Sequence, residues 1–287
     1  MFFYFMKNLK ELFLIFLRGL FMGTADAIPG VSGGTIALIT GIYQRLIHAI
    51  NEVNTLLVKE LFNLNFKKFF KNFKKIDFAL LIPLLSGIVL ALLILSHLID
   101  YLLSAWTAIT YAFFLGLILS SAIFVYRQAG RNHNKNFLFF AIGLFFAFWF
   151  VGLKTLETNH SLLVLLFSGA IAICAMILPG ISGAFILVLL NQYEFLINVI
   201  KNLMFDKIAV FVLGALIGIL SFSRFLDFLL KKHKPATMSF LTGLMIGSLR
   251  LPYKKIVSSY NNLLLVVFIG LIGFFLVFIL EKKFNHK

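Results

Sequence analysis

The chain alternates between long apolar stretches and short polar or basic ones. The apolar stretches occupy residues 12–27, 35–50, 78–99, 105–126, 137–153, 162–190, 208–230, 236–249 and 263–280. A helix of about 20 apolar residues is long enough to cross the hydrocarbon core of a bilayer. The pattern therefore predicts an all-α polytopic membrane protein, with residues 1–287 forming a single transmembrane domain.

Two short breaks rich in glycine and proline occur in the apolar pattern. The first separates residues 12–27 from residues 35–50, and the second lies inside residues 162–190. Pro29, Gly30, Ser32, Gly33, Ile36 and Tyr43 recur 150 positions later as Pro179, Gly180, Ser182, Gly183, Ile186 and Tyr193. Arms of about 16 residues are marginal for a full span. Each break is therefore predicted to be the tip of a re-entrant helical hairpin, with two short spans as the alternative.

The repetition continues beyond the breaks. Gly87, Asp100, Gly116 and Gly143 match Gly214, Asp227, Gly243 and Gly270, all 127 positions later. The smaller offset indicates that the first copy carries an insertion at residues 54–76. The chain is thus predicted to contain two units, residues 11–153 and 161–280, each a hairpin followed by three transmembrane helices. The matched glycines are interpreted as sites of close helix packing.

Composition and charge agree with a membrane protein and predict its orientation. The chain is 61% hydrophobic and only 13% charged, with a formal net charge of +15. Basic loops stay in the cytoplasm, so the N-terminus, residues 127–135, residues 231–234 and the C-terminus are assigned there. Each unit then crosses an odd number of times, and the two copies are inverted. Arg250, Lys254 and Lys255 fall on the outer side in this scheme, against the rule.

The insertion in the first unit combines lysine and phenylalanine. Its lysines are Lys59, Lys67, Lys68, Lys71, Lys74 and Lys75, and phenylalanines recur between them at helical spacing. Such a segment is typical of a basic amphipathic helix that lies on an anionic membrane surface. We therefore expect anionic lipids as its partners and no nucleic acid. The single cysteine, Cys174, excludes a disulfide within the chain.

The chemistry of the breaks favours an anion. Interrupted helices in inverted repeats are typical of transporters, and a helix that starts at a glycine-rich break directs free N–H groups at the tip. The predicted phosphate-binding residues are Gly30, Ser32, Gly33, Gly34, Thr35, Gly180, Ser182 and Gly183. Opposed hairpins would bring both tips together near the middle of the membrane. Close helix packing without a ligand is the alternative reading.

Two charged residues occur only in the first hairpin. Asp26 has Met176 at its repeat position. An acid inside a membrane segment is a functional candidate, so Asp26 is predicted to carry a coupling proton or to pair with Arg18. Arg18 is a candidate ligand for the phosphate or a side chain that extends to the interface. Arg224 and Asp227, three residues apart, are interpreted as a local pair.

The first hairpin resembles a known family. Residues 18–43, RGLFMGTADAIPGVSGGTIALITGIY, are similar to the signature of a bacterial membrane family associated with polyprenyl-phosphate translocation, the PopT family. The resemblance covers the whole chain in length and layout. It implies a transporter of the bacterial cytoplasmic membrane that recycles the lipid carrier undecaprenyl phosphate. It implies no catalytic residue, and no cofactor or metal is expected.

Two other functions compete with a lipid transporter. A membrane polyprenyl-pyrophosphate phosphatase would need an arginine in the loops and paired glutamates, and residues 31–35 and 181–185 contain neither. A carrier or channel for a small inorganic anion would use the same tips equally well. Only the family resemblance and the surface helix favour a lipid over that anion.

Overall fold

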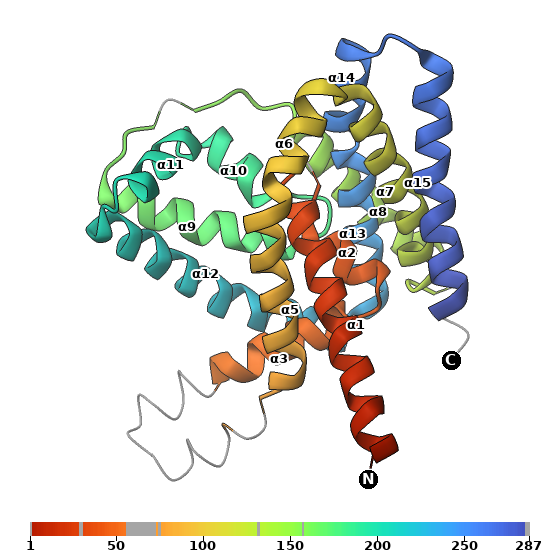
Figure 1. The fold of residues 1–287 in the computed structure, drawn as a ribbon, viewed down its shortest axis with the longest axis horizontal. Helices are drawn as coiled ribbons and strands as arrows, with labels where there is room; N and C mark the ends of the chain where they lie inside the picture. Colours follow the sequence, from red (N-terminus) through yellow and green to blue (C-terminus); the bar gives the residue numbers. More distant parts are fainter. Residues whose placement is uncertain are drawn as a thin grey trace.

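A computed structural model describes residues 2–28, 31–55, 73, 76–130, 133–156 and 158–284, and all regular elements in these ranges are helical (Figure 1). The first half contains α1 (Phe2–Asp26), α2 (Gly33–Ile39), α3 (Tyr43–Thr55), α5 (Phe78–Leu90), the π-helix η2 (Ala91–Leu95), α6 (Ser96–Ala105), α7 (Thr107–Arg127) and α8 (His133–Phe150). The second half contains α9 (Leu162–Ile177), α10 (Gly183–Leu189), α11 (Tyr193–Lys201), α12 (Phe205–Lys232), α13 (Lys234–Ser248), α14 (Arg250–Ser259) and α15 (Leu263–Phe284). The all-helical prediction is confirmed.

The helices are apolar enough for a membrane protein, although few are long. Within the described residues, α7 and α12 are each long and apolar enough to cross a bilayer alone. The bent pair α10 and α11, with a 104° angle between them, passes the same test only when taken together. Shorter apolar helices occupy residues 78–94, 136–150, 162–177 and 263–279. The predicted amphipathic insertion falls almost entirely on residues outside the described ranges.

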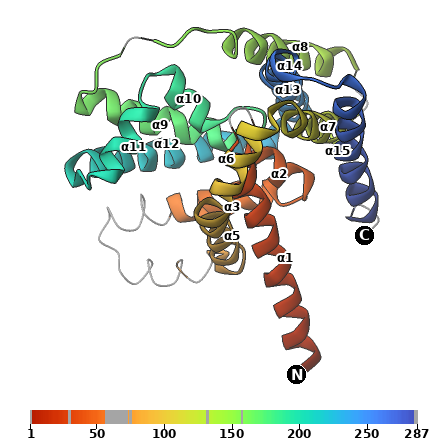
Figure 2. The same cartoon turned by 45° about the horizontal axis from the view of Figure 1, so that its top comes forward.

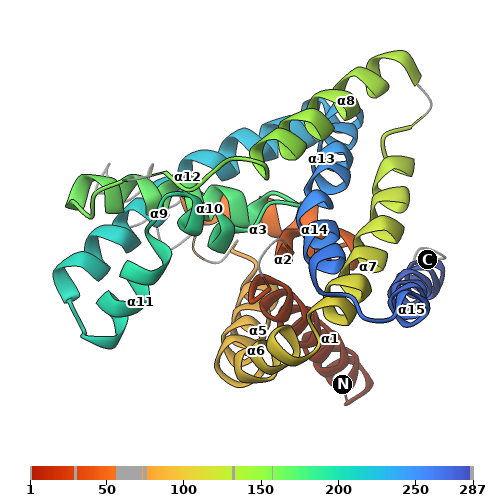
Figure 3. The same cartoon turned by 90° about the horizontal axis from the view of Figure 1, so that it is seen from above.

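Four helix pairs form the framework. In the first half α1 packs on α5, and in the second half α9 packs on α12. The other two pairs join the halves, because α7 packs on α15 and α8 packs on α13. Figure 3 shows α8 running beside α13, and Figure 2 shows the N-terminal part of α1 extending away from the other helices. The molecule is therefore held together by pairs both within and between its halves.

Matched glycines allow these pairs to approach closely. A Cβ atom added to Gly87 would lie 2.2 Å from the carbonyl oxygen of Phe16, and one added to Gly214 would lie 1.9 Å from that of Leu166. Both the glycines and the carbonyls correspond at the offsets found in the sequence. At Gly87 and Gly214 no larger residue fits without moving a backbone, which agrees with their interpretation as packing sites, whereas a Cβ added to Gly270 would lie 3.4 Å from the nearest atom, an ordinary contact.

The second arm of each hairpin differs from the prediction. Residues 35–50 were expected to form one helix, but α2 ends at Ile39 and α3 starts afresh at Tyr43. Gly41 adopts φ +72° between them, and Asn191 adopts φ +54° at the matching corner between α10 and α11. A residue in the left-handed region closes a helix C-terminus. Each hairpin therefore continues into a corner and a further helix.

Candidate functional site

Two side chains at the first break, those of Asp26 and Ser32, cap the start of α2. α1 ends at Asp26, whose carboxylate accepts a hydrogen bond from the backbone N–H of Gly33 at 2.7 Å. Ser32 is the N-cap of α2, and its Oγ accepts from the N–H of Gly34 at 3.1 Å. Two of the free N–H groups at the start of α2 are thus satisfied by side chains. Pro29 and the predicted ligand Gly30 lie outside the described residues.

The second break is built in the same way. Gly180 adopts φ +85°, which glycine reaches without strain. Ser182 is the N-cap of α10, and its Oγ accepts from the N–H of Phe185 at 3.4 Å. The paired serines of the sequence therefore have the same local role in both hairpins. A Cβ added to Gly183 would lie 2.4 Å from the Met176 side chain, which occupies the position matching Asp26.

The two breaks touch each other directly. Ser32 donates from Oγ to the carbonyl oxygen of Leu178 at 3.0 Å. The N–H of Gly180 donates to Oγ1 of Thr35 at 3.1 Å, and the hydroxyl of Tyr43 donates to the carbonyl of Ile177 at 3.2 Å. These contacts join residues more than 130 positions apart. The structure thus brings together the two tips that the sequence assigned to one site.

The predicted phosphate donors are engaged with protein in this arrangement. Ser32 and Thr35 are fully buried, and Ser182 is 3% exposed. The carboxylate of Asp26 occupies the N-terminal end of α2, where the anion was expected. The tips are therefore closed on each other. A phosphate at this place would have to displace the Asp26 carboxylate and part the contacts of Ser32 and Thr35.

Arg18 is not brought to the tip. It lies eight residues before Asp26 on α1, about 12 Å along the helix axis. Its guanidinium is within electrostatic range of Glu11 and Arg45. The pairing of Asp26 with Arg18 considered from the sequence is not formed, because Asp26 bonds to Gly33 instead.

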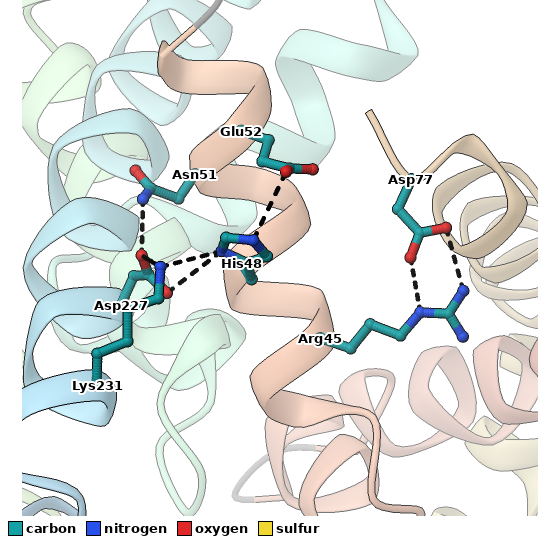
Figure 4. Close-up of polar contacts among 7 residues, drawn as sticks. All are labelled: Arg45, His48, Asn51, Glu52, Asp77, Asp227 and Lys231. Carbon is teal, nitrogen blue, oxygen red and sulfur yellow. Dashed lines mark hydrogen bonds and ion pairs between the residues drawn. The ribbon is translucent and has the colours of Figure 1, made fainter. Parts of the chain in front are cut away.

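A group of ion pairs surrounds Arg45, at the end of the molecule that holds the N-terminus, and was not predicted from the sequence. The guanidinium of Arg45 bonds to Asp77 at 2.6 Å (Figure 4). It also bonds to Glu11 at 3.3 Å. Asp77 also caps α5 by accepting from the N–H of Leu80 at 3.1 Å. The hydrogen bond from Arg45 holds the pKa of Asp77 below its usual value. This group fixes the start of α5 against α3 and α1.

A second polar cluster joins α3 to α12 (Figure 4). Asp227, 6% exposed, accepts hydrogen bonds from Nζ of Lys231 and Nδ2 of Asn51, each at 2.8 Å. Nδ1 of His48 lies 3.7 Å from the same carboxylate. Arg224, interpreted from the sequence as the partner of Asp227, is exposed and makes no ion pair with the described residues. The four-residue spacing of Asp227 and Lys231 places their side chains on one face of a helix, and this spacing could have predicted the pair.

Comparison with known proteins identifies the family. The model of a family described as undecaprenyl phosphate translocase-like matches residues 22–264. The chain is 41% identical over 249 residues to a polyprenyl-phosphate transporter of Vibrio cholerae, covering 86% of this chain and 80% of that protein. The chain belongs to this undecaprenyl phosphate translocase-like family. The resemblance noted in the first hairpin is confirmed.

A second translocase-like relative is more distant but matches almost end to end. It is a polyprenyl-phosphate transporter of Staphylococcus aureus, 29% identical over 283 residues, covering 92% of this chain and 93% of that protein. No solved structure matches the chain. The translocase-like match includes both breaks and the cluster of His48 and Asp227, and it begins after Arg18.

Proposed function

We propose that the protein transports polyprenyl phosphate across the bacterial cytoplasmic membrane and returns undecaprenyl phosphate to the cytoplasmic leaflet for reuse. The observation that carries this proposal is membership in the translocase-like family, because two relatives matched over most of their length are named polyprenyl-phosphate transporters. The direct contact between the two hairpin tips supports it, since transporter sites form where interrupted helices meet.

The proposed architecture is a pair of inverted units, with the N- and C-termini in the cytoplasm. The packing of α1 on α5 corresponds to that of α9 on α12, and the packing of α7 on α15 corresponds to that of α13 on α8. Each correspondence joins elements related by the sequence repeat. The basic segments support the orientation through the preference of lysine and arginine for the cytoplasmic side.

The proposed phosphate site lies at the tips. Its candidate ligands are Gly30, Ser32, Gly33, Gly34, Thr35, Gly180, Ser182 and Gly183, with Arg18 joining only if the phosphate approaches along α1. The described arrangement is then the closed form of the site. Opening requires the hydroxyl of Ser32 to turn from the Leu178 carbonyl to a phosphate oxygen, and the N–H of Gly180 to turn from Oγ1 of Thr35 to the phosphate. Both donors keep an acceptor in this exchange, and the Leu178 carbonyl keeps the hydrogen bond from the N–H of Ile181 at 3.4 Å.

Asp26 is proposed to couple transport to a proton. Its carboxylate and a phosphate compete for the same N–H groups at the start of α2. Protonation of Asp26 would weaken its own hydrogen bond from Gly33 and free those groups for the lipid. A phosphate that moves towards a negative cytoplasm works against about 2.3 kcal/mol per charge per 100 mV. An accompanying proton offsets one of those charges.

Reconstitution in liposomes tests the function. Separate liposomes contain labelled undecaprenyl phosphate, undecaprenyl pyrophosphate or enclosed inorganic phosphate, and leaflet exchange, phosphate release and phosphate flux are measured in parallel. We expect exchange without release. Release of inorganic phosphate from undecaprenyl pyrophosphate would contradict the transporter and favour the phosphatase. Flux of inorganic phosphate without lipid exchange would favour the small-anion carrier instead.

A further inference from the structure

The α6–α7 corner and the α14–α15 link lie at the end of the molecule opposite the two termini (Figure 1), and residues of both line a polar groove. It has a volume of about 320 Å³ and opens between the α6–α7 corner and the α14–α15 link. The polar residues that line it are Ser104, Trp106, Thr107, Ser259, Asn261 and Asn262. The site proposed above uses none of these residues.

Some hydrogen-bond donors in this groove are engaged and others are free. The hydroxyls of Ser104, Thr107 and Ser259 all donate to backbone carbonyl groups of their own helices or of the preceding one. Oδ1 of Asn262 caps α15 by accepting from the N–H of Leu265 at 3.2 Å, which leaves its NH₂ group available. The indole N–H of Trp106, 51% exposed, and the amide of Asn261 have no hydrogen-bond partner within the described ranges. The groove therefore offers donors suited to an acceptor such as a phosphate oxygen.

Positive charge lies beside the groove. Lys255 is four residues before Ser259 on α14, so the two side chains share a face of the helix. Lys254 and Lys255 are both exposed, and neither forms an ion pair with a carboxylate of the described residues. Arg250 differs, because it donates to the carbonyl of Phe148 at 2.7 Å and covers the Phe148 ring. The two lysines that break the charge rule are thus unpaired, and Lys255 lies on the helix face that carries Ser259 of the groove.

An apolar stripe runs along α15, starting next to the polar groove. Leu265 lines the polar groove, and Phe268, Ile272, Phe275 and Ile279 follow it at three- and four-residue spacing. Together with Leu271 and Leu276, these four residues form an open apolar surface made only of α15 side chains. From Leu265 to Ile279 the stripe is about 21 Å long. A phosphate group bonded to a long hydrocarbon chain matches this sequence of polar and apolar surfaces.

We propose that this surface is the docking site where polyprenyl phosphate enters from the outer leaflet. The phosphate binds in the polar groove beside Lys254 and Lys255, and the first isoprene units lie along the apolar stripe of α15. The inference rests on the proposed transport function and adds a place of capture before the lipid reaches the tips. It also explains basic residues on the side of the membrane where the charge rule predicts few.

Photolabelling tests the docking site independently of transport. The full-length protein is reconstituted in lipid nanodiscs with a polyprenyl phosphate that carries a diazirine next to the phosphate. We expect labelled peptides from residues 104–107 and 259–266, and weaker labelling with the corresponding neutral polyprenol. Equal labelling by phosphate and alcohol would overturn the proposal, because it would indicate nonspecific apolar adsorption. Cross-links between two copies of α15 without lipid would assign the stripe to a dimer instead.

A charge variant then connects docking to transport. Replacing both lysines (Lys254→Gln with Lys255→Gln) should reduce labelling and raise the KM for lipid exchange about three- to tenfold, with kcat unchanged. Lys10→Gln is the matched control, since this exposed lysine lies near the start of α1, at the opposite end of the molecule from the α14–α15 link (Figure 1). Unchanged labelling and KM in the double variant would overturn the docking site while leaving the transport function intact. Normal labelling without any exchange by the wild-type protein would instead contradict the transport function.

Discussion

The hydroxyl of Ser32 donates a hydrogen bond to the carbonyl of Leu178 at 3.0 Å and accepts one from the N–H of Gly34 at 3.1 Å. One side chain therefore caps α2 and fastens the first hairpin to the second. Ser182 occupies the matching position but caps only its own helix. Loss of Ser32 would therefore remove a helix cap and a contact between the hairpins, whereas loss of Ser182 would remove only a helix cap.

Ser32→Ala should destabilise the protein more than Ser182→Ala. The first change removes a cap and leaves the half-buried Leu178 carbonyl with only the long hydrogen bond from the N–H of Ile181 at 3.4 Å, a loss of about 2 kcal/mol. The second removes only a cap, about 1 kcal/mol. Thermal unfolding in detergent measures the difference. Equal effects would mean that the contact between the hairpins contributes nothing, and unchanged lipid exchange in the double alanine variant would assign the breaks to packing alone.

Asp26→Asn should preserve the fold and abolish coupling. The asparagine oxygen still accepts from the N–H of Gly33, so unfolding should change by less than about 1 kcal/mol. Since the amide cannot bind or release a proton, the rate of lipid exchange should no longer respond to an imposed proton gradient. Asp26→Ala is the comparison, because it leaves that N–H without its acceptor and should cost about 1–3 kcal/mol. A gradient response that survives in Asp26→Asn would contradict a coupling role.

Stability should fall in acid through Asp77. The hydrogen bond from Arg45 lowers the pKa of Asp77 in the folded protein below its unfolded value. The contribution is thus complete above the unfolded pKa and is lost as the pH falls through the folded one. Asp77→Asn should flatten this acid limb, measured as unfolding temperature against pH. Glu11→Gln is the control, because its contact with Arg45 is longer and more exposed, and it should change the profile less.

Asp227→Ala should loosen α3 from α12. The substitution removes the acceptor of both Lys231 and Asn51 in a nearly buried place, which should cost about 1–3 kcal/mol. Arg224→Ala, one turn earlier on the exposed side of α12, should change stability by less than about 0.5 kcal/mol. Hydrogen exchange of α3 reports the local effect. A larger effect of the Arg224 change would restore the pairing first inferred from the sequence.

The repeats made much of this fold predictable. Residues such as Gly87 and Gly214 recur because each faces a backbone carbonyl at the same place in its own helix pair. The matching Pro-Gly-x-Ser-Gly breaks likewise predicted two tips of similar construction. Both signals are local, since they follow from spacing along the chain and from residue size.

The partners of the polar groups were not predictable in the same way. Arg45 meets Asp77 across 32 residues, and Asn51 meets Asp227 across 176, so each contact depends on where whole helices lie. The sequence also predicted free donors at the tips, whereas Ser32 and Thr35 bond to the opposite hairpin. A residue pattern identifies which groups can form hydrogen bonds, but not which partners lie within reach in the folded protein. Gly41 itself indicates a corner, but residues 35–50 were predicted to form one continuous apolar arm.

The closed contact between the hairpins has a consequence for ion leakage. Water or protons cross a membrane protein most easily along a file of polar groups that still need hydrogen-bond partners. Ser32, Thr35 and Tyr43 bond to the facing backbone, and all three are at most 2% exposed. A chain of water molecules would gain few bonds there and would have to break those already made. The same contacts that close the site thus insulate an energised membrane between transport cycles.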